Sequence, residues 1–176
     1  MGDRCYMTLT IGGDISDVDS LDTLVDAIAS EGGGGSKAVR ESFIAALANG
    51  DQPYFEFEEV NYADLDCFGV ACEMGLDALT FHGAGDDYAA GHESHNGLTG
   101  ETFQWGEAEE GMILIEVIQA VINTHHPAER AIEKLQEELN KVTASEWKDL
   151  RPFTVSGTTA DALAAEVARH KIEKAA

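Results

Sequence analysis

The central half of the chain carries negative charge with no compensating cation. Between Arg40 and Arg130, 89 consecutive residues include 18 Asp or Glu residues and no Lys or Arg. No acidic run in this segment exceeds two residues, and the acids are interleaved with apolar residues. Burying an unpaired carboxylate is costly, so the fold must expose the acids while it buries the apolar residues between them. This pattern predicts a folded domain with a negative surface rather than an acidic tail.

The composition fits one domain. A chain of 176 residues with 44% hydrophobic residues has enough apolar material for one core, and it is too apolar for a disordered acidic chain despite a net charge of -22. Residues 1–40 hold seven acids and three bases, whereas residues 130–176 hold eight of each. We therefore predict a single α+β domain over residues 1–176, with an acidic segment at 41–129 and a charge-balanced helical part at 130–176.

The location expected from the sequence is the cytoplasm. The longest apolar run, Met112 to Ile115, ends at Glu116, far short of the roughly 20 apolar residues that a membrane span needs. The first residues contain no basic leader followed by a short apolar core. Three cysteines, an odd number, suit a reducing compartment. We expect no membrane association and inert core cysteines.

Periodicity and turn patterns predict a small, mostly antiparallel sheet with four to five helices. Strands are expected at residues 5–12, 53–60, 79–81 and 98–105. Helices are expected around residues 21–28 and 39–47, and at 63–74, 127–142 and 160–174. Asp17, Asp19 and Ser20 are candidate N-cap or first-turn residues of the first helix, Asn49-Gly50 ends the second, and Thr158 or Thr159 caps the last. In the third helix, Leu65, Phe68 and Cys72 are expected to face inward. Residues 112–122 fit a strand or a helix equally.

Two glycine-rich stretches are predicted to be loops. Residues 31–37, EGGGGSK, separate the first two helices and match a common engineered linker unit, but they do not match a phosphate-binding loop. Residues 83–97 are predicted to form a polar loop that ends in a turn at Asn96-Gly97.

The second loop contains the strongest candidate for a metal-dependent enzyme. Five potential ligands fall within ten residues: Asp86, Asp87, His92, Glu93 and His95. Carboxylate and imidazole groups bind divalent metals, so a metal-dependent hydrolase is one alternative function. The spacing of the two histidines matches no zinc motif, however, and a solvated hairpin loop is the favoured interpretation. The sequence also lacks a nucleophile elbow, a dinucleotide fingerprint and a phosphate-loop motif. We therefore expect no cofactor, no metal and no enzymatic activity.

Direct binding to nucleic acid is disfavoured, because phosphate contacts need Lys and Arg. The acids themselves suggest mimicry instead. Glu56 and Glu58, two residues apart on a strand, lie roughly 6.6 Å apart, a spacing similar to that of neighbouring phosphates on one nucleic-acid strand. In size and charge the chain resembles the DNA-mimic inhibitors that mobile elements use against restriction or CRISPR systems. The resemblance covers residues 41–129 and includes no sequence motif.

That resemblance implies a protein that occupies and inhibits the basic groove of a nucleic-acid-binding protein. The remaining alternative is a general acidic interaction or assembly protein with another kind of partner. The C-terminal helices are candidates for scaffolding or homodimer formation. The candidate partner-binding residues are Glu56, Glu58, Glu59, Asp64, Asp66, Glu73, Asp77, Asp86, Asp87, Glu93, Glu107, Glu109 and Glu110.

Overall fold

Buried and exposed side chains alternate along the first part of the longest described strand. In β1 (Arg4–Ile15), the side chains of Cys5, Met7, Leu9 and Ile11 are buried on one face, while the residues between them are at least partly exposed. The computed structural model describes residues 4–85, 89–106, 115–124, 130–136 and 149–175. Within these ranges β1 is the strand around which the rest of the sheet is built.

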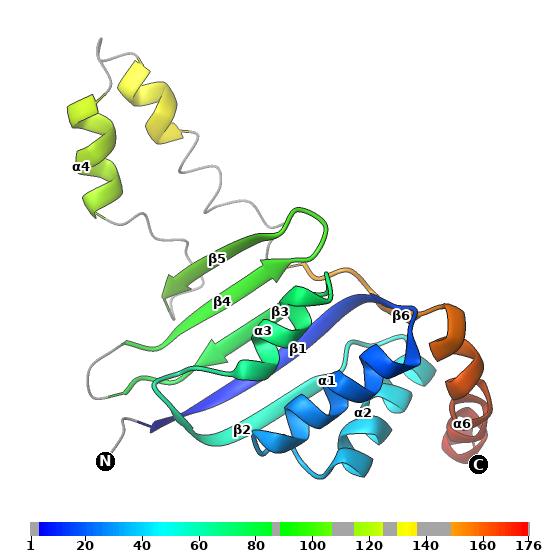
Figure 1. Ribbon diagram of the computed structural model, residues 1–176. Helices are drawn as coiled ribbons and strands as arrows, with labels where there is room; N and C mark the ends of the chain where they lie inside the picture. The colour runs from blue at the N-terminus through cyan, green and yellow to red at the C-terminus, as the bar shows by residue number, and fades with distance from the viewer. Residues whose placement is uncertain (1–3, 86–88, 107–114, 125–129, 137–148, 176) are drawn as a thin grey trace.

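The sheet is predominantly antiparallel, as predicted. Its path runs β2 (Tyr54–Asn61), β1, β3 (Asp77–His82), β4 (Gly91–Asn96) and β5 (Glu101–Gly106), with every neighbouring pair antiparallel (Figure 1). A short strand that the sequence did not indicate, β6 (Phe153–Val155), pairs in parallel with the end of β1. The C-terminal part of the chain therefore belongs to the same sheet as the acidic segment.

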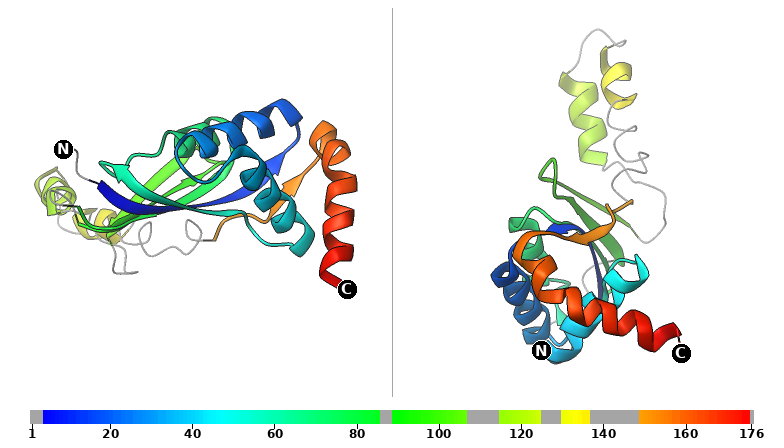
Figure 2. Two further views of the ribbon diagram at one scale, coloured as in Figure 1. Left: turned by 90° about the horizontal axis from the view of Figure 1, so that it is seen from below. Right: turned by 90° about the vertical axis from the view of Figure 1, so that its right-hand side faces the viewer.

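Three helices cover one face of this sheet. They are α1 (Val18–Ser30), α2 (Ser36–Asn49) and α3 (Asp66–Glu73), which lie on the same side in Figures 1 and 2. The core between the layers is apolar, with Leu21, Leu24 and Ile28 of α1 fully buried. The α6 helix (Gly157–Ala175) packs on α2; Leu163 near its start is buried, and Lys174 near its end donates a hydrogen bond of 2.8 Å to the Asn49 side chain.

Local sequence signals set the ends of the first two helices. The Asp17 carboxylate accepts a hydrogen bond from the Ser20 backbone N–H at 3.0 Å, which identifies Asp17, among the three candidates, as the N-cap of α1. Gly50 ends α2 with a left-handed φ of 75°, a conformation that glycine adopts without steric penalty.

The loop predicted for residues 83–97 is wrong in its second half, because Gly91–Asn96 forms β4. These residues have low strand propensity, and their extended conformation comes from pairing with β3 on one side and β5 on the other. The turn at Asn96-Gly97 is confirmed, since it joins β4 to β5, and the Asn96 side chain accepts hydrogen bonds from the backbone N–H groups of Leu98 and Thr99.

Helix predictions also need correction. Residues 112–122 fit a strand or a helix by sequence, and their described part belongs to the helix α4 (Ile115–Thr124). Residues 130–136 are helical, in agreement with the helix predicted at 127–142. The α6 helix begins at Gly157, upstream of the expected cap at Thr158 or Thr159. In α3 the fully buried side chains are Cys67 and Ala71, whereas Phe68 and Cys72 are only partly buried.

Candidate protein-interaction surface

The face of the sheet that α1, α2 and α3 leave open carries a cluster of acid and tyrosine side chains. Because Phe55 and Phe57 point to the helices, Glu56 and Glu58 of β2 point to the opposite face. The Tyr6 hydroxyl of β1 donates a hydrogen bond to the Glu56 carboxylate at 2.8 Å, and the Tyr54 hydroxyl lies 3.4 Å from the same oxygen. Hydrogen bonding to Tyr54 and then to Glu56 raises the pKa of Tyr6, so its hydroxyl stays protonated.

Glu59 sits apart from this cluster. Its backbone has a left-handed φ of 57°, next to an irregularity in the β1–β2 pairing. Its carboxylate forms an ion pair of 2.6 Å with Arg4. An exposed pair of this kind contributes little to stability, but it removes Glu59 from the unpaired negative charge.

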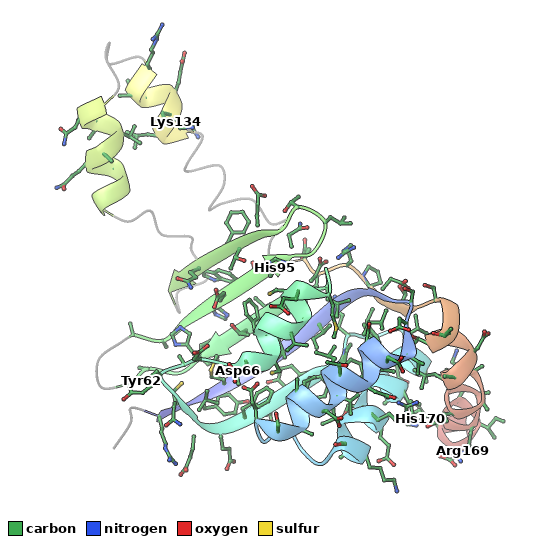
Figure 3. All side chains as sticks on the ribbon, viewed as in Figure 1. Tyr62, Asp66, His95, Lys134, Arg169 and His170 are labelled. Atoms are coloured by element: carbon green, nitrogen blue, oxygen red, sulfur yellow. The ribbon has the colours of Figure 1, made fainter. Side chains whose placement is uncertain are left out.

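A second group of predicted residues lies where the chain passes from β2 into α3. Asp64, Asp66 and Glu73 are exposed, and among the residues that the structure describes no Lys or Arg side chain bonds to them. Tyr62, two residues before Asp64, is 67% exposed. Figure 3 shows Tyr62 and Asp66 toward the end of the molecule opposite Arg169 and His170 of α6. The cations of α6 therefore do not neutralise these acids.

Four exposed acids and one exposed tyrosine lie between the middle of β2 and the start of α3. We call Glu56, Glu58, Tyr62, Asp64 and Asp66 the acidic tip. Glu56 and Glu58 point to the open face of the sheet, and Asp66 starts the helix that covers the other face. The tip thus wraps around the end of the sheet instead of forming one flat patch.

Three further exposed acids, not among the predicted contact residues, lie on α1. Asp19, Asp22 and Asp26 are exposed at spacings of three and four residues, on the side of the helix opposite its buried leucines. Asp22 pairs with Arg40 at 2.6 Å, and Asp26 accepts a hydrogen bond from Ser36. Their spacing along the helix could have predicted an acidic face, but they precede Arg40 and so fall outside the acidic segment defined at residues 41–129. Since α1 packs beside α3, they extend the negative surface of the helix layer.

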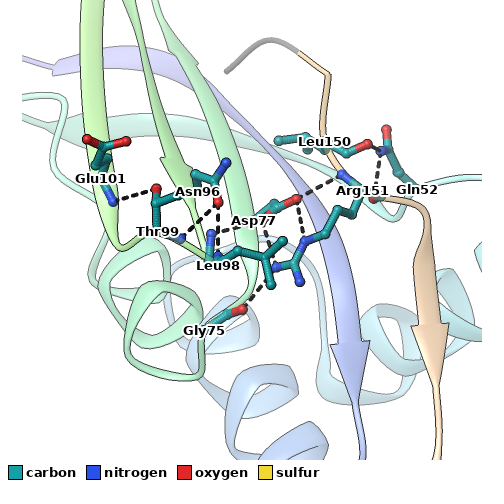
Figure 4. Close-up of polar contacts among 10 residues, drawn as sticks. Gln52, Gly75, Asp77, Asn96, Leu98, Thr99, Glu101, Leu150 and Arg151 are labelled. Atoms are coloured by element: carbon teal, nitrogen blue, oxygen red, sulfur yellow. Dashed lines mark hydrogen bonds and ion pairs between the residues drawn. The ribbon is translucent and has the colours of Figure 1, made fainter. Parts of the chain in front are cut away.

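Asp77 does not belong to any exposed surface, and its prediction as a contact residue is wrong. Its side chain is 5% exposed and accepts hydrogen bonds from the backbone N–H, Nε and Nη2 of Arg151 at 2.7–2.9 Å (Figure 4). The Gly97 backbone N–H donates a further bond of 2.8 Å. Burial alone would raise the pKa of Asp77, but the hydrogen bonds from Arg151 and Gly97 outweigh it and lower the pKa. The carboxylate is a structural anchor for the C-terminal segment.

The described candidate metal ligands, His92, Glu93 and His95, do not form one cluster. His92 and His95 are three residues apart on β4, so their side chains lie on opposite faces of the sheet. His92 stacks on Trp105 with 4.9 Å between ring centroids, and the Nδ1 atom of His95 lies 3.0 Å from the Thr102 hydroxyl. No group of three or more potential metal ligands occurs in the described ranges. Five other predicted site residues, Asp86, Asp87, Glu107, Glu109 and Glu110, lie outside those ranges.

The two cysteines of α3 have the properties of inert thiols. Burial first, and then the nearby Glu31 carboxylate, raise the pKa of Cys67. Burial and the charge of Glu93 raise the pKa of Cys72 to about 11. A thiol with a raised pKa is a poor nucleophile at neutral pH because little thiolate is present.

Comparison of the chain with protein-family models, with curated proteins and with solved structures gave no match. Within the described ranges, none of the helices combines the length and the apolar character that crossing a bilayer requires.

Proposed function

We propose that the protein binds the basic cleft of a nucleic-acid-binding protein through its acidic tip and inhibits that protein as a nucleic-acid mimic. The single observation that carries the proposal is that exposed carboxylates of the tip have no Lys or Arg partner among the described residues. Unpaired like charges destabilise a fold by mutual repulsion. Binding to a partner of complementary charge would offset this repulsion.

The neighbouring tyrosines support a protein partner. Tyr54 and Tyr62 are 50% and 67% exposed, and both are next to acids of the tip. Tyrosine is enriched at the energetic centres of protein interfaces, because its ring contributes contact area with little entropy loss. Carboxylates add fast association and partner choice through electrostatic complementarity. Aromatic and acidic groups together suit a cleft lined by Arg and Lys.

The shape of the tip is compatible with insertion into a cleft. Its acids occupy both faces at the end of the sheet, so walls on either side of a groove would each meet carboxylates. A duplex likewise presents phosphates on both sides. Under this proposal the protein acts in the cytoplasm, and the exposed Ile172 of α6, at 71% exposure, is available for the homodimer predicted from the C-terminal helices.

The proposal is tested by capturing partners from nuclease-treated lysate on the immobilised protein. The tip variant carries Glu56→Gln, Glu58→Gln, Asp64→Asn and Asp66→Asn. A control variant neutralises four acids elsewhere, Asp149, Asp161, Glu166 and Glu173, and so has the same net charge. We expect the wild type and the control to retain basic nucleic-acid-binding proteins at about 50 mM NaCl and to release them at about 500 mM, because salt screens charge pairing.

The tip variant should lose this capture, and added duplex DNA or RNA should displace the captured partner from the wild type. Equal capture by the tip variant and the control would show that only overall charge matters. A partner that nucleic acid does not displace would favour the general acidic interaction protein over a mimic.

A further inference from the structure

A hollow of about 500 Å³ opens beside the acidic tip, on the helix-covered side of the sheet. In Figure 1, α3 lies over β3, and the described helices leave β4 and β5 uncovered on this side. Tyr62 and Ala63 contribute one wall, and β3, β4 and β5 contribute the floor. Small residues, among them Ala90 and Gly91, line it and leave the space unfilled.

The backbone of the wall next to the tip is held in an unfavourable conformation. Tyr62 and Ala63 have left-handed φ values of 55° and 54°, and side-chain-bearing residues keep this conformation only where the surroundings fix it. Conformations of this kind concentrate at ligand-binding positions. Here they direct the chain across the mouth of the hollow before α3 begins.

The floor presents hydrogen-bond acceptors. The Glu93 carboxylate accepts a bond of 3.1 Å from the Gln104 amide N–H, which leaves its other oxygen and the Gln104 carbonyl oxygen as acceptors. The Nδ1 atom of His82 lies 3.3 Å from the Gly83 carbonyl. Since a carbonyl only accepts, Nδ1 is the donor there.

Glycine at position 91 is needed for this arrangement. A Cβ atom at Gly91 would meet Nε2 of His82 at 3.0 Å and the Trp105 carbonyl oxygen at 2.9 Å. The His82 ring therefore lies directly over the backbone of β4, where a side chain would otherwise fill the floor. None of the side chains that line the hollow is a Lys or Arg.

We infer that the hollow binds a guanidinium group, and specifically an arginine side chain of the basic partner. A guanidinium has five N–H donors in a planar fork, which suits several acceptors around one carboxylate better than the compact ammonium of lysine does. The exposed ring of Tyr62 at the rim can stack on the same plane. The inference rests on the proposed function, because it assigns one anchoring contact to the same partner.

The test uses small probes, so its outcome is separate from that of the lysate capture. N-acetyl-arginine amide is titrated into the full-length protein and followed by amide chemical shifts. We expect shifts confined to Thr80, His82, Gly91, Glu93 and Gln104. N-acetyl-citrulline amide, which has the same shape without the charge, should bind roughly tenfold more weakly or not at all, because the charge-assisted bond to Glu93 is lost. N-acetyl-lysine amide should also bind more weakly.

Two variants with the same change in charge test whether Glu93 is the group that binds arginine. Glu93→Gln keeps an acceptor at this position and should weaken arginine binding by roughly tenfold. Glu101→Gln, an equal charge change at an exposed position of β5 outside the lining, should not. Urea unfolding verifies that both variants are folded. Equal binding of citrulline or lysine, unchanged affinity in Glu93→Gln, or shifts spread over α1 and β2 would each overturn the inference.

A free arginine-like metabolite shares this chemistry with a partner's side chain, and a blocked Gly-Gly-Arg-Gly-Gly peptide separates the two. Binding of the peptide at least as tight as that of the amide supports docking of a partner's arginine. Binding of the amide without the peptide would overturn it in favour of a small-molecule site. If the probes bind as expected but lysate capture fails, the proposed function fails while the guanidinium site stands.

Discussion

At the scale of single residues, the pairing of Asp77 with Arg151 joins positions 74 residues apart and connects the segment before β6 to the sheet. Arg151→Met would leave a buried carboxylate without its cation, and removing one partner of such a pair is strongly destabilising. We expect a loss of about 3 kcal/mol in the free energy of unfolding, measured by urea denaturation. Arg169→Met, on the exposed surface of α6, should change it by no more than about 0.5 kcal/mol.

The double variant Asp77→Asn, Arg151→Met isolates the interaction. Because the double variant removes both charges, its free energy of unfolding should fall by less than the sum of the decreases in the two single variants, Asp77→Asn and Arg151→Met. Additive losses would mean that the two side chains act independently, contrary to the geometry.

Asp77 also predicts a specific dependence on pH. Its folded pKa is lowered, so the folded state binds a proton less readily than the unfolded chain, whose aspartates titrate near about 3.9. The stabilisation is therefore fully present above that value and is lost as the pH falls through the lower, folded pKa. Urea midpoints measured from about pH 5 to about pH 2.5 should fall less steeply for Asp77→Asn than for the wild type. Parallel curves would contradict the assignment.

At the scale of elements, Glu31 links the end of α1 to the start of α3. Its carboxylate accepts a hydrogen bond of 2.5 Å from the Cys67 backbone N–H. Burial raises the pKa of Glu31 more than this bond lowers it. Ionisation above that pKa therefore weakens the fold, whereas the acceptor atom itself stabilises the helix end.

Two substitutions at Glu31 separate charge from acceptor. At pH 7, Glu31→Gln keeps the acceptor without the charge and should match or exceed the wild type in free energy of unfolding. Glu31→Ala removes the acceptor and should lose about 1 kcal/mol. Thermal and urea unfolding of the two variants measure the difference. A Gln variant as unstable as the Ala variant would show that the charge itself is needed.

The glycine-rich connection between α1 and α2 is packed into the fold at one position. A Cβ atom at Gly33 would lie 2.6 Å from Cγ2 of Ile28 and 3.0 Å from Cε1 of Phe57, whereas Gly35 has no heavy atom within 4 Å of that point. We expect Gly33→Ala to lower the free energy of unfolding by about 1–3 kcal/mol. Gly35→Ala should lower it by no more than about 1 kcal/mol, because Gly35 is the N-cap of α2 and Ala is a poorer N-cap than Gly. Similar small effects at both positions would mean that the segment is a passive linker.

Elements with a strong local pattern were predictable, and those held by distant partners were not. Residues 53–60 alternate phenylalanine with glutamate, and β2 follows that alternation. In contrast, GHESHN has no β-branched residue, and β4 exists because two strands flank it. Strand β6 has only three residues and depends on β1.

The residues of the candidate surface also include some that local sequence predicts and some that it does not. Exposure of Glu56 and Glu58 followed from the period of the strand, but burial of Asp77 did not, since its partner Arg151 lies far along the chain and is brought to it by the fold. The hollow at His82 and Glu93 draws its lining from three strands and two loops. No local spacing in the sequence could have identified it.

At the scale of the whole molecule, the net charge of -22 gives the protein two competing properties. Repulsion among the exposed acids favours expansion of the chain, while the same field attracts a basic partner and accelerates association. A surface kept for binding should therefore cost stability in the free protein. That cost is measurable without knowing the partner.

The four-site tip variant provides the measurement. At about 20 mM NaCl, the tip variant should have a higher free energy of unfolding than the wild type, because repulsion among Glu56, Glu58, Asp64 and Asp66 is gone. Raising NaCl to about 500 mM shortens the screening length to a few ångströms. The wild type should therefore gain stability, and the difference in free energy of unfolding between the wild type and the tip variant should become smaller. If the variant is instead less stable at low salt, with an unchanged salt response, these carboxylates stabilise the fold through local contacts. In that case the tip would need no partner to explain its composition.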